Sequence, residues 1–285
     1  MNKGESQMNF REWYMTEYFM EYEIIDYVTG RTAKSFNQMG GVALILNLNE
    51  QKDANCTMTF YYQANDPMQY KLSVPAGRQG LVWFGDQRFG TVPPGIDFSQ
   101  RFGLKITSDE PIIVQSTQGD AKLNDLVTNS MVTQMFYPGP LTKKHCEWYY
   151  IDCIVITAEG NPLEEREWLS VLNPQPKDAE VKITFIPGGT FKFPEAILEM
   201  DDPNICKTEY KITVKGERLL PLDVYKIPGV MPNQHYAVRV SSTEPVTIMG
   251  IRRIYKRGEY DYSTSVAFLD AIPTGKESNG KNVIK

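Results

Sequence analysis

Histidine, a common residue in acid–base catalysis and metal binding, occurs only twice in this chain. The two histidines, His145 and His235, have no cysteine or carboxylate at the spacing of a metal site. The motifs of serine hydrolases, zinc peptidases and phosphate-binding loops are absent from the sequence. The sequence therefore predicts no metal and no cofactor, and it favours a protein that binds without catalysis.

Pairs of carboxylates are the remaining catalytic candidates. Neighbouring residues of a strand point to opposite faces, so adjacent acids are typical of solvated turns. Such pairs occur at Asp109-Glu110, Glu164-Glu165 and Asp201-Asp202. A carbohydrate-active enzyme whose carboxylates meet only in the fold stays open as an alternative.

Five other residues are candidates for binding a small polar ligand. Arg78, in a Pro-Ala-Gly-Arg turn, could hold a carboxylate, a phosphate or neighbouring hydroxyl groups, or could be a surface or interface residue. Gln115 and Thr117 lie on one face of a strand, where they could bind ligand hydroxyls or satisfy buried backbone groups. Asp97 could contact Arg78, although a turn role fits it better. Trp13 could supply an apolar wall, although aromatic side chains are major core residues.

The second half of the chain repeats the first, block by block and in the same order. The matched blocks are Glu12-Trp13-Tyr14 with Glu147-Trp148-Tyr149, Leu46 to Phe60 with Leu172 to Phe185, Tyr70 to Val74 with Tyr210 to Val214, Phe102 to Ser108 with Tyr236 to Ser242, and Glu110 to Val114 with Glu244 to Ile248. The repeat predicts two copies of one domain that join near Pro138-Gly139-Pro140.

Both copies have the sequence pattern of β-strands. Apolar and polar residues alternate with period two in segments such as 71–74, 104–107 and 181–185, and turn residues lie between such segments. Many short strands in copies of about 130 residues are typical of sandwiches. We therefore expect an all-β protein of two tandem β-sandwich domains. Their predicted limits are 9–138 and 147–273, with a linker at 139–146 and a disordered tail at 274–285.

Charge and hydropathy limit the partners that we expect. Lys and Arg number 30 and Asp and Glu number 35, so the net charge is −5, which disfavours nucleic acid as a partner. The basic run at 252–257 is diluted by Glu259 and Asp261, as on a solvated strand face. A leader peptide and a long apolar segment are both missing, so we expect a cytoplasmic protein with no membrane partner and reduced cysteines.

Four segments of the first copy occur in an order that is typical of a known family. They are Tyr70 to Arg78, Trp83 to Asp86, Val92 to Phe98 and Ser108 to Thr117. These segments resemble the Val-Pro-Ala-x-Arg turn, the Pro-x-Asp-Phe/Tyr segment and the Ser-Asp-x-Pro-Ile-Val-Val-Gln-x-Thr strand of the sensory rhodopsin transducer family. The resemblance covers roughly Trp13 to Pro138.

The chain also departs from the family pattern. The second copy matches only through the repeat, and it has Lys215-Gly216-Glu217-Arg218 where the family has its Pro-Ala-x-Arg turn. The family often has histidine and arginine at the positions of Ser116 and Gln118, which puts in doubt a site that depends on that histidine.

The resemblance implies a β-sandwich that self-associates into oligomers. Most members of the family look like small-molecule binding domains, with sugars or related metabolites as the leading ligands. We therefore predict non-catalytic binding of a sugar or sugar acid by Trp13, Arg78, Asp97, Gln115 and Thr117, in a homo-oligomer. Two other classes stay open: an oligomeric signalling adaptor or interaction protein, and a carbohydrate-active enzyme.

Overall fold

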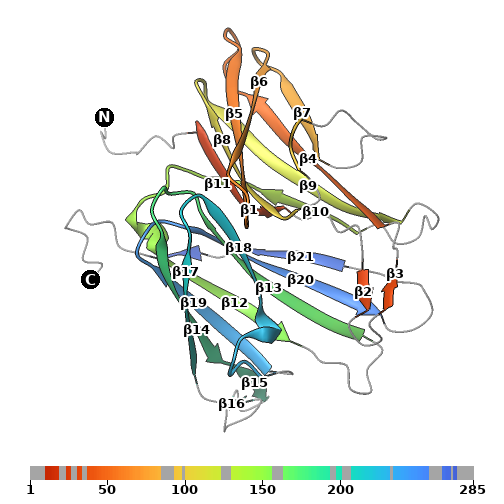
Figure 1. Cartoon of the computed structure of the whole chain (residues 1–285), viewed down its shortest axis with the longest axis vertical. Helices are drawn as coiled ribbons and strands as arrows, with labels where there is room; N and C mark the ends of the chain where they lie inside the picture. Colours follow the sequence, from red (N-terminus) through yellow and green to blue (C-terminus); the bar gives the residue numbers. More distant parts are fainter. Residues whose placement is uncertain are drawn as a thin grey trace. The chain divides into compact units, whose positions relative to one another are not determined.

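The structure is a computed structural model of the chain, and its contacts divide it into two units, Met1–Pro140 and Leu141–Lys285 (Figure 1). It describes residues 10–18, 24–26, 31–33, 37–84, 93–97, 100–122, 130–155, 163–192, 197–200, 207–231, 234–256, 265–270 and 272–274. The tail predicted to be disordered lies almost wholly outside these residues. The predicted domain limits stay a prediction.

Unit 1 consists of two antiparallel sheets and a small hairpin, which β2 (Ile24–Asp26) and β3 (Arg31–Ala33) form. The five-stranded sheet has the order β11-β1-β8-β5-β6 and the four-stranded sheet the order β10-β9-β4-β7. The bounds are β1 (Glu12–Tyr18), β4 (Asn37–Asn47), β5 (Ala54–Tyr62), β6 (Met68–Val74), β7 (Gln79–Phe84), β8 (Phe102–Ser108), β9 (Ile112–Lys122), β10 (Ser130–Met135) and β11 (Tyr137–Pro138).

Unit 2 repeats this arrangement strand for strand. Its sheets have the orders β22-β12-β19-β14-β17 and β18-β13-β20-β21, with an added hairpin of β15 and β16. The bounds are β12 (Glu147–Val155), β13 (Leu163–Asn173), β14 (Ala179–Pro187), β15 (Gly189–Lys192), β16 (Ile197–Met200), β17 (Thr208–Val214), β18 (Arg218–Asp223), β19 (Gln234–Ser242), β20 (Thr247–Lys256), β21 (Ser265–Asp270) and β22 (Ile272–Pro273). Two short 3-10 helices, η1 (Lys143–Cys146) and η2 (Val224–Lys226), complete the unit.

Alternating side chains explain how the two sheets of unit 1 form one core. On β7, Val82 and Phe84 are buried, while Leu81 and Trp83, which alternate with them, are not. The ring of Phe84 lies 6.0 and 5.8 Å from the rings of Phe60 and Phe102, which belong to the other sheet. Such face-to-face packing of two antiparallel sheets is a β-sandwich. The predicted fold class, all-β with two tandem sandwiches, is confirmed.

One interior position shows how the two cores differ. A Cβ on Gly41 would lie 1.3 Å from the hydroxyl oxygen of Tyr18, so the tyrosine ring fills that space in unit 1. By the repeat, unit 2 has Glu167 at the position of Gly41 and Cys153 at the position of Tyr18. Glu167 is fully buried and accepts a hydrogen bond from Tyr150 of the other sheet. This interior space is therefore filled by Tyr18 of the five-stranded sheet in unit 1 and by Glu167 of the four-stranded sheet in unit 2.

A buried asparagine holds the loops at one end of unit 1. The Nδ2 atom of Asn47, which is 1% exposed, donates to the backbone oxygens of Lys52, Val74 and Pro75 at 2.8, 3.1 and 3.3 Å. Its Oδ1 atom accepts from the backbone nitrogen of Asn49 at 2.9 Å. One side chain thus links the β4–β5 loop to the β6–β7 turn.

Unit 2 has the same device. Asn173, which is fully buried, donates to the backbone oxygens of Lys177, Val214 and Lys215 at 2.8, 3.1 and 3.2 Å. It accepts from the backbone nitrogen of Gln175 at 3.1 Å. The Leu-Asn block of the sequence repeat is therefore explained by hydrogen bonding.

The turns that these asparagines hold also have matching backbones. The third residue of each turn is left-handed, with φ of 60° at Gly77 and 56° at Glu217. The backbone N–H groups of Gly77 and Glu217 each donate a hydrogen bond of 2.8 Å to a backbone oxygen. The acceptor lies in the loop that follows β4 in unit 1 and β13 in unit 2. Unit 2 thus keeps the turn without the Pro-Ala-x-Arg sequence, and it has Arg218 at the position of Arg78.

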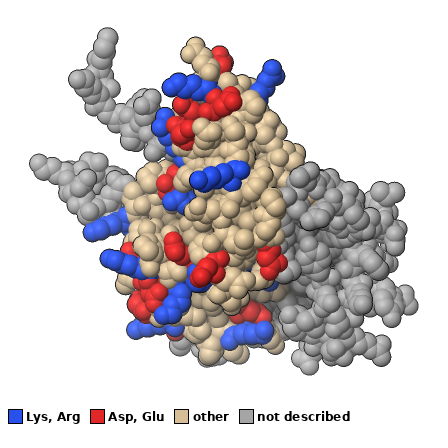
Figure 2. Space-filling view, turned by 45° about the horizontal axis from the view of Figure 1, so that its top comes forward, with Lys and Arg blue, Asp and Glu red and all other residues tan. Residues whose placement is uncertain are grey.

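Two surface properties bear on the kind of partner. No helix within the described part of the chain is long and apolar enough to cross a membrane. In Figure 2, blue and red side chains are interspersed over the described residues of the face shown. Such mixing indicates that this face has no extended field of one sign.

Candidate functional site

Trp13 lies in the interior of unit 1 and is 3% exposed. Its indole Nε1 atom donates to the backbone oxygens of Phe10 and Ile112 at 3.2 and 3.0 Å, and its ring stacks on Phe10. Trp148 is its counterpart in unit 2 and donates to the backbone oxygen of His145 at 2.7 Å. Both tryptophans therefore use their polar atom to hold the chain that precedes the first strand.

Arg78 and Asp97 lie at opposite ends of the unit 1 sandwich. The turn that holds the exposed Arg78 follows β6 at the Ala54 end of β5. Asp97 donates its backbone N–H to the hydroxyl oxygen of Tyr62, at the other end of β5, and its carboxylate accepts from Gln100 at 2.6 Å. Eight residue steps of strand correspond to about 26 Å. The contact between Asp97 and Arg78, which was the alternative to a turn role for Asp97, is therefore not made.

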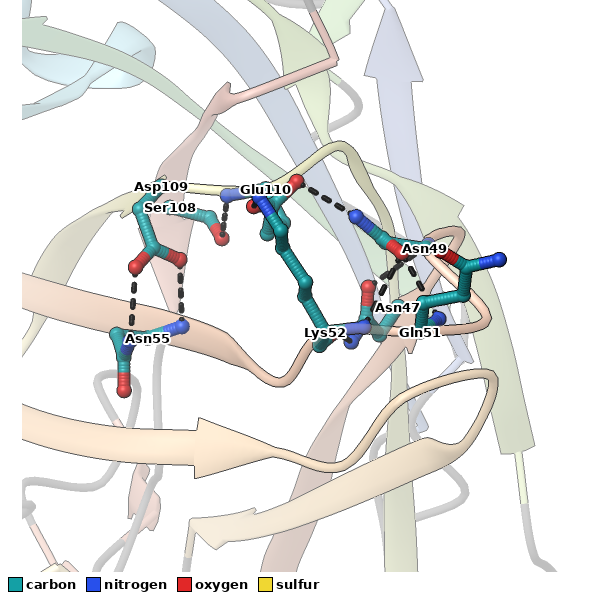
Figure 3. Close-up of polar contacts among 8 residues, drawn as sticks. All are labelled: Asn47, Asn49, Gln51, Lys52, Asn55, Ser108, Asp109 and Glu110. Atoms are coloured by element: carbon teal, nitrogen blue, oxygen red, sulfur yellow. Dashed lines mark hydrogen bonds and ion pairs between the residues drawn. The ribbon is translucent and has the colours of Figure 1, made fainter.

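Polar side chains surround the end of the sandwich where Arg78 lies, and Figure 3 shows how they pair. Glu110 accepts from Asn49 at 2.9 Å and forms an ion pair with Lys52 at 3.9 Å. Asp109 accepts from the side chain and the backbone nitrogen of Asn55 at 2.7 and 2.8 Å. These two hydrogen bonds hold the pKa of Asp109 below its usual value, and the bond from the Asn55 side chain has the larger effect.

The geometry of Figure 3 also bears on catalysis. The carboxylates of Asp109 and Glu110 turn toward different partners, as adjacent residues of a turn do. His145 is buried beside Trp148, and His235 is exposed on β19. Among the described residues, no group of three or more His, Cys, Asp or Glu side chains could hold a metal ion. Asp201-Asp202 lies outside the described residues.

Gln115 and Thr117 lie on the outer face of the four-stranded sheet of unit 1. The residues between and before them, Ser116 and Val114, are fully buried against the other sheet, while Gln115 and Thr117 are half-buried on the opposite side. The pairing with β4 places Gln115 beside Leu44. The predicted pair therefore shares a face, with an amide and a hydroxyl group above an apolar strand.

Trp83 is the member of this face that the sequence analysis missed as a candidate for the site. It pairs with Val42, and Val42 pairs with Thr117, so these three residues form one row across β7, β4 and β9. The half-buried indole ring of Trp83 thus lies on the same face as Gln115 and Thr117. Alternation along Gln79–Phe84 would have indicated the face of Trp83, but only the strand order places it near Thr117.

Three rows of side chains make up the described part of this face, which we call the outer face. Its rows are Trp83, Val42 and Thr117; Leu81, Leu44 and Gln115; and Gln79, Leu46 and Ile113. Leu81 is 60% exposed and Leu46 is 38% exposed. The outer face thus combines an apolar floor with one indole ring and three uncharged polar side chains.

The matching face of unit 2 has a different chemistry. Met249 and Ile251 stand at the positions of Gln115 and Thr117, and each is 2% exposed. Asp223 stands at the position of Trp83, beside Trp168, and its carboxylate forms an ion pair with Lys226 at 3.3 Å. Unit 2 therefore lacks the half-buried amide and hydroxyl groups of the outer face, and its indole, Trp168, stands at the position of Val42 rather than at that of Trp83.

Comparison with known proteins relates the first unit to one family. Residues 24–138 match the family model described as Anabaena sensory rhodopsin transducer. A crystal structure of Thermotoga maritima 1070 covers 45% of this chain and 96% of its own, at 16% identity and a TM-score of 0.32. The solved Anabaena sensory rhodopsin transducer covers 37% of this chain and 93% of its own, at 27% identity and a TM-score of 0.26. No curated protein matches the chain.

Proposed function

Since residues 24–138 belong to the sensory rhodopsin transducer family, we propose that the chain is a non-catalytic carbohydrate-binding protein whose site is the outer face of unit 1. The observation that carries the proposal is the row of Trp83, Val42 and Thr117, with Gln115 in the next row. The unpaired cysteines Cys56 and Cys146 are in line with a cytoplasmic location.

The outer face has the groups that a sugar ring needs. One side of a pyranose ring presents C–H groups, and these favour contact with an aromatic face such as that of Trp83. The rim of the ring presents hydroxyls that both donate and accept hydrogen bonds, as the Gln115 amide and the Thr117 hydroxyl also do. Apolar lining with a few placed polar groups is typical of small-molecule sites.

A thermal-shift screen of the full chain against monosaccharides, sugar acids and sugar phosphates tests the proposal. A ligand at 100 times its Kd adds about 2.7 kcal/mol to the folded state, which raises the Tm by several degrees. We expect a selective shift that Trp83→Ala reduces strongly. Trp168→Ala, which removes a half-buried indole from the matching strand face of unit 2, should leave the shift in place.

Three candidates of the sequence analysis are not among the residues of the outer face, and the same screen tests each of them. Arg78→Ala and Asp97→Ala probe the two ends of the sandwich, and Trp13→Phe probes the core. A shift that survives Trp83→Ala but is lost in Arg78→Ala would contradict the outer face as the site. It would instead support the end of the sandwich shown in Figure 3.

Exposed leucines favour a second function, that of an adaptor or interaction protein. Leu46, Leu48 and Leu81 are 38%, 40% and 60% exposed within or beside the outer face. Contiguous exposed apolar side chains often mark a protein–protein interface. A copy of the chain or another protein would then cover Gln115.

Sedimentation of the wild type and of Leu81→Asp distinguishes the two functions. An interaction protein should lose mass in the variant, because a charge in an apolar interface is costly to bury. Gln63→Asp, at an exposed position just after β5, adds the same single negative charge and is the control. An unchanged mass, together with a sugar-dependent shift, would favour carbohydrate binding.

A further inference from the structure

The outer face differs in charge from the other outward face of unit 1. None of its nine described side chains is charged. The five-stranded sheet instead has Glu12 and Lys105 paired at 3.5 Å, with the Lys105 ammonium 5.4 Å from the Tyr14 ring. An anionic ligand loses hydrating water when it binds, and an uncharged surface offers no ion pair to replace that hydration. An anion would therefore bind poorly to the outer face.

The outer face is also longer than one sugar ring. Its three rows are two residues apart along each strand, so they extend over about 13 Å, and the three strands extend over about 10 Å. Polar groups lie at both ends of this area, with Thr117 in the first row and Gln79 in the third. Apolar side chains lie between them, and the most exposed is Leu81.

We infer that the ligand of the outer face is an uncharged oligosaccharide of two or more residues, bound at one site per chain. This inference rests on the proposed function, whose ligand class it narrows. One ring stacks on Trp83 with its hydroxyls on Thr117 and Gln115, and the next lies over Leu81 toward Gln79. Unit 2 contributes no second site because Met249 and Ile251 replace the polar pair and are buried.

A glycan array of neutral and acidic oligosaccharides, probed with the full chain, tests this inference. We expect binding to neutral glycans that persists in 0.5 M salt, since no ion pair is broken by screening. Calorimetry with glucose, maltotriose and cellotriose should then give one site per chain. We expect an affinity about tenfold higher for the bound trisaccharide than for glucose.

Two variants locate the contacts along the face. Trp83→Ala should lower the affinity for glucose and for the trisaccharide alike. Gln79→Ala should lower only the affinity for the trisaccharide, because the first ring does not reach the third row. Trp168→Ala is the matched control in unit 2, and circular dichroism confirms that each variant is folded.

The possible outcomes separate this inference from the proposed function. Salt-sensitive binding of acidic glycans that Trp83→Ala abolishes would overturn the neutral ligand and leave carbohydrate binding in place. Equal affinities for glucose and the trisaccharide, or two sites per chain, would overturn the extended single site. Binding to no glycan on the array would overturn both.

Discussion

Buried polar side chains show most clearly how single residues determine the structure. Asn47 and Asn173 are buried at one end of their units. Each donates to three backbone oxygens in two separate parts of the chain. A buried carbonyl oxygen that loses its donor keeps the cost of its desolvation. These two side chains therefore contribute more to stability than their size suggests.

We predict that Asn47→Ala and Asn173→Ala each lower the free energy of unfolding by about 2 kcal/mol, because backbone oxygens then remain buried without a donor. Chemical denaturation followed by circular dichroism measures the change. Asn55→Ala is the control, because its hydrogen bonds to Asp109 are exposed and should contribute less than about 1 kcal/mol. A loss in Asn47→Ala no larger than in this control would contradict the role assigned to the buried side chain.

The tryptophans of unit 1 show that residue type does not determine whether a side chain is buried or lies on a surface. Trp13 and Trp83 belong to the same unit and both lie in strands. Trp13 is buried and donates to two backbone oxygens, whereas Trp83 lies on the outer face. Indole groups serve equally well in a core and at a binding surface, so residue type alone does not separate the two.

At the scale of elements, two turns have the same backbone geometry but different sequences. They are the turn between β6 and β7 and its counterpart between β17 and β18. Each turn requires a left-handed third residue, and unit 2 meets that requirement with Glu217 rather than glycine. A non-glycine residue in this region is strained by contact between its Cβ atom and the backbone. The hydrogen bonds made by Asn173 hold the turn despite this strain.

We predict that Glu217→Gly raises the free energy of unfolding by about 0.5 kcal/mol, since relief of strain exceeds the added flexibility of the unfolded chain. Gly77→Ala should lower it by about 1 kcal/mol. The added methyl group would lie 3.7 Å from Glu50, so strain rather than a clash is the cause. Thermal denaturation measures both effects, and a stabilised Gly77→Ala variant would contradict the left-handed turn.

At the scale of the whole molecule, two units of one topology have different surfaces and interiors. Both have the same order of strands in both sheets. Unit 1 keeps an uncharged outer face on which Leu46 and Leu81 are exposed, whereas most of the matching residues of unit 2, Met249 and Ile251 among them, are buried. The inner polar groups differ as well, with Glu167 of unit 2 at the position of Gly41. Duplication thus preserved the hydrogen-bonded framework and allowed the side chains on its faces to change.

Because the hydrogen-bond partners of Asn47 and Asn173 lie in their own units, we predict that the two alanine substitutions act independently. The losses of unfolding free energy should add within about 0.5 kcal/mol in the double variant. Hydrogen exchange should show reduced protection only in the unit that carries each single substitution. Reduced protection in both units of a single variant would show instead that the two cores unfold together.

Much of the fold could be predicted from the sequence. Period-two alternation in segments such as 71–74 and 104–107 directly reflects strands with one buried face, and the ordered repeat predicted two similar domains. The face shared by Gln115 and Thr117 also follows from alternation along a single strand. The distance between Arg78 and Asp97 could not be predicted in this way, because it depends on which ends of the strands adjoin.

The sequence by itself determined the strands, the repeat and the absence of familiar catalytic motifs, because these depend on local spacing and residue type. Only the tertiary structure decided that Trp13 is enclosed while Trp83 lies beside Val42 and Thr117. It also decided that Met249 and Ile251, on the matching face of unit 2, are buried. The physical reason is that hydrogen bonding between strands far apart in the chain sets which side chains are neighbours, and no local pattern records that pairing.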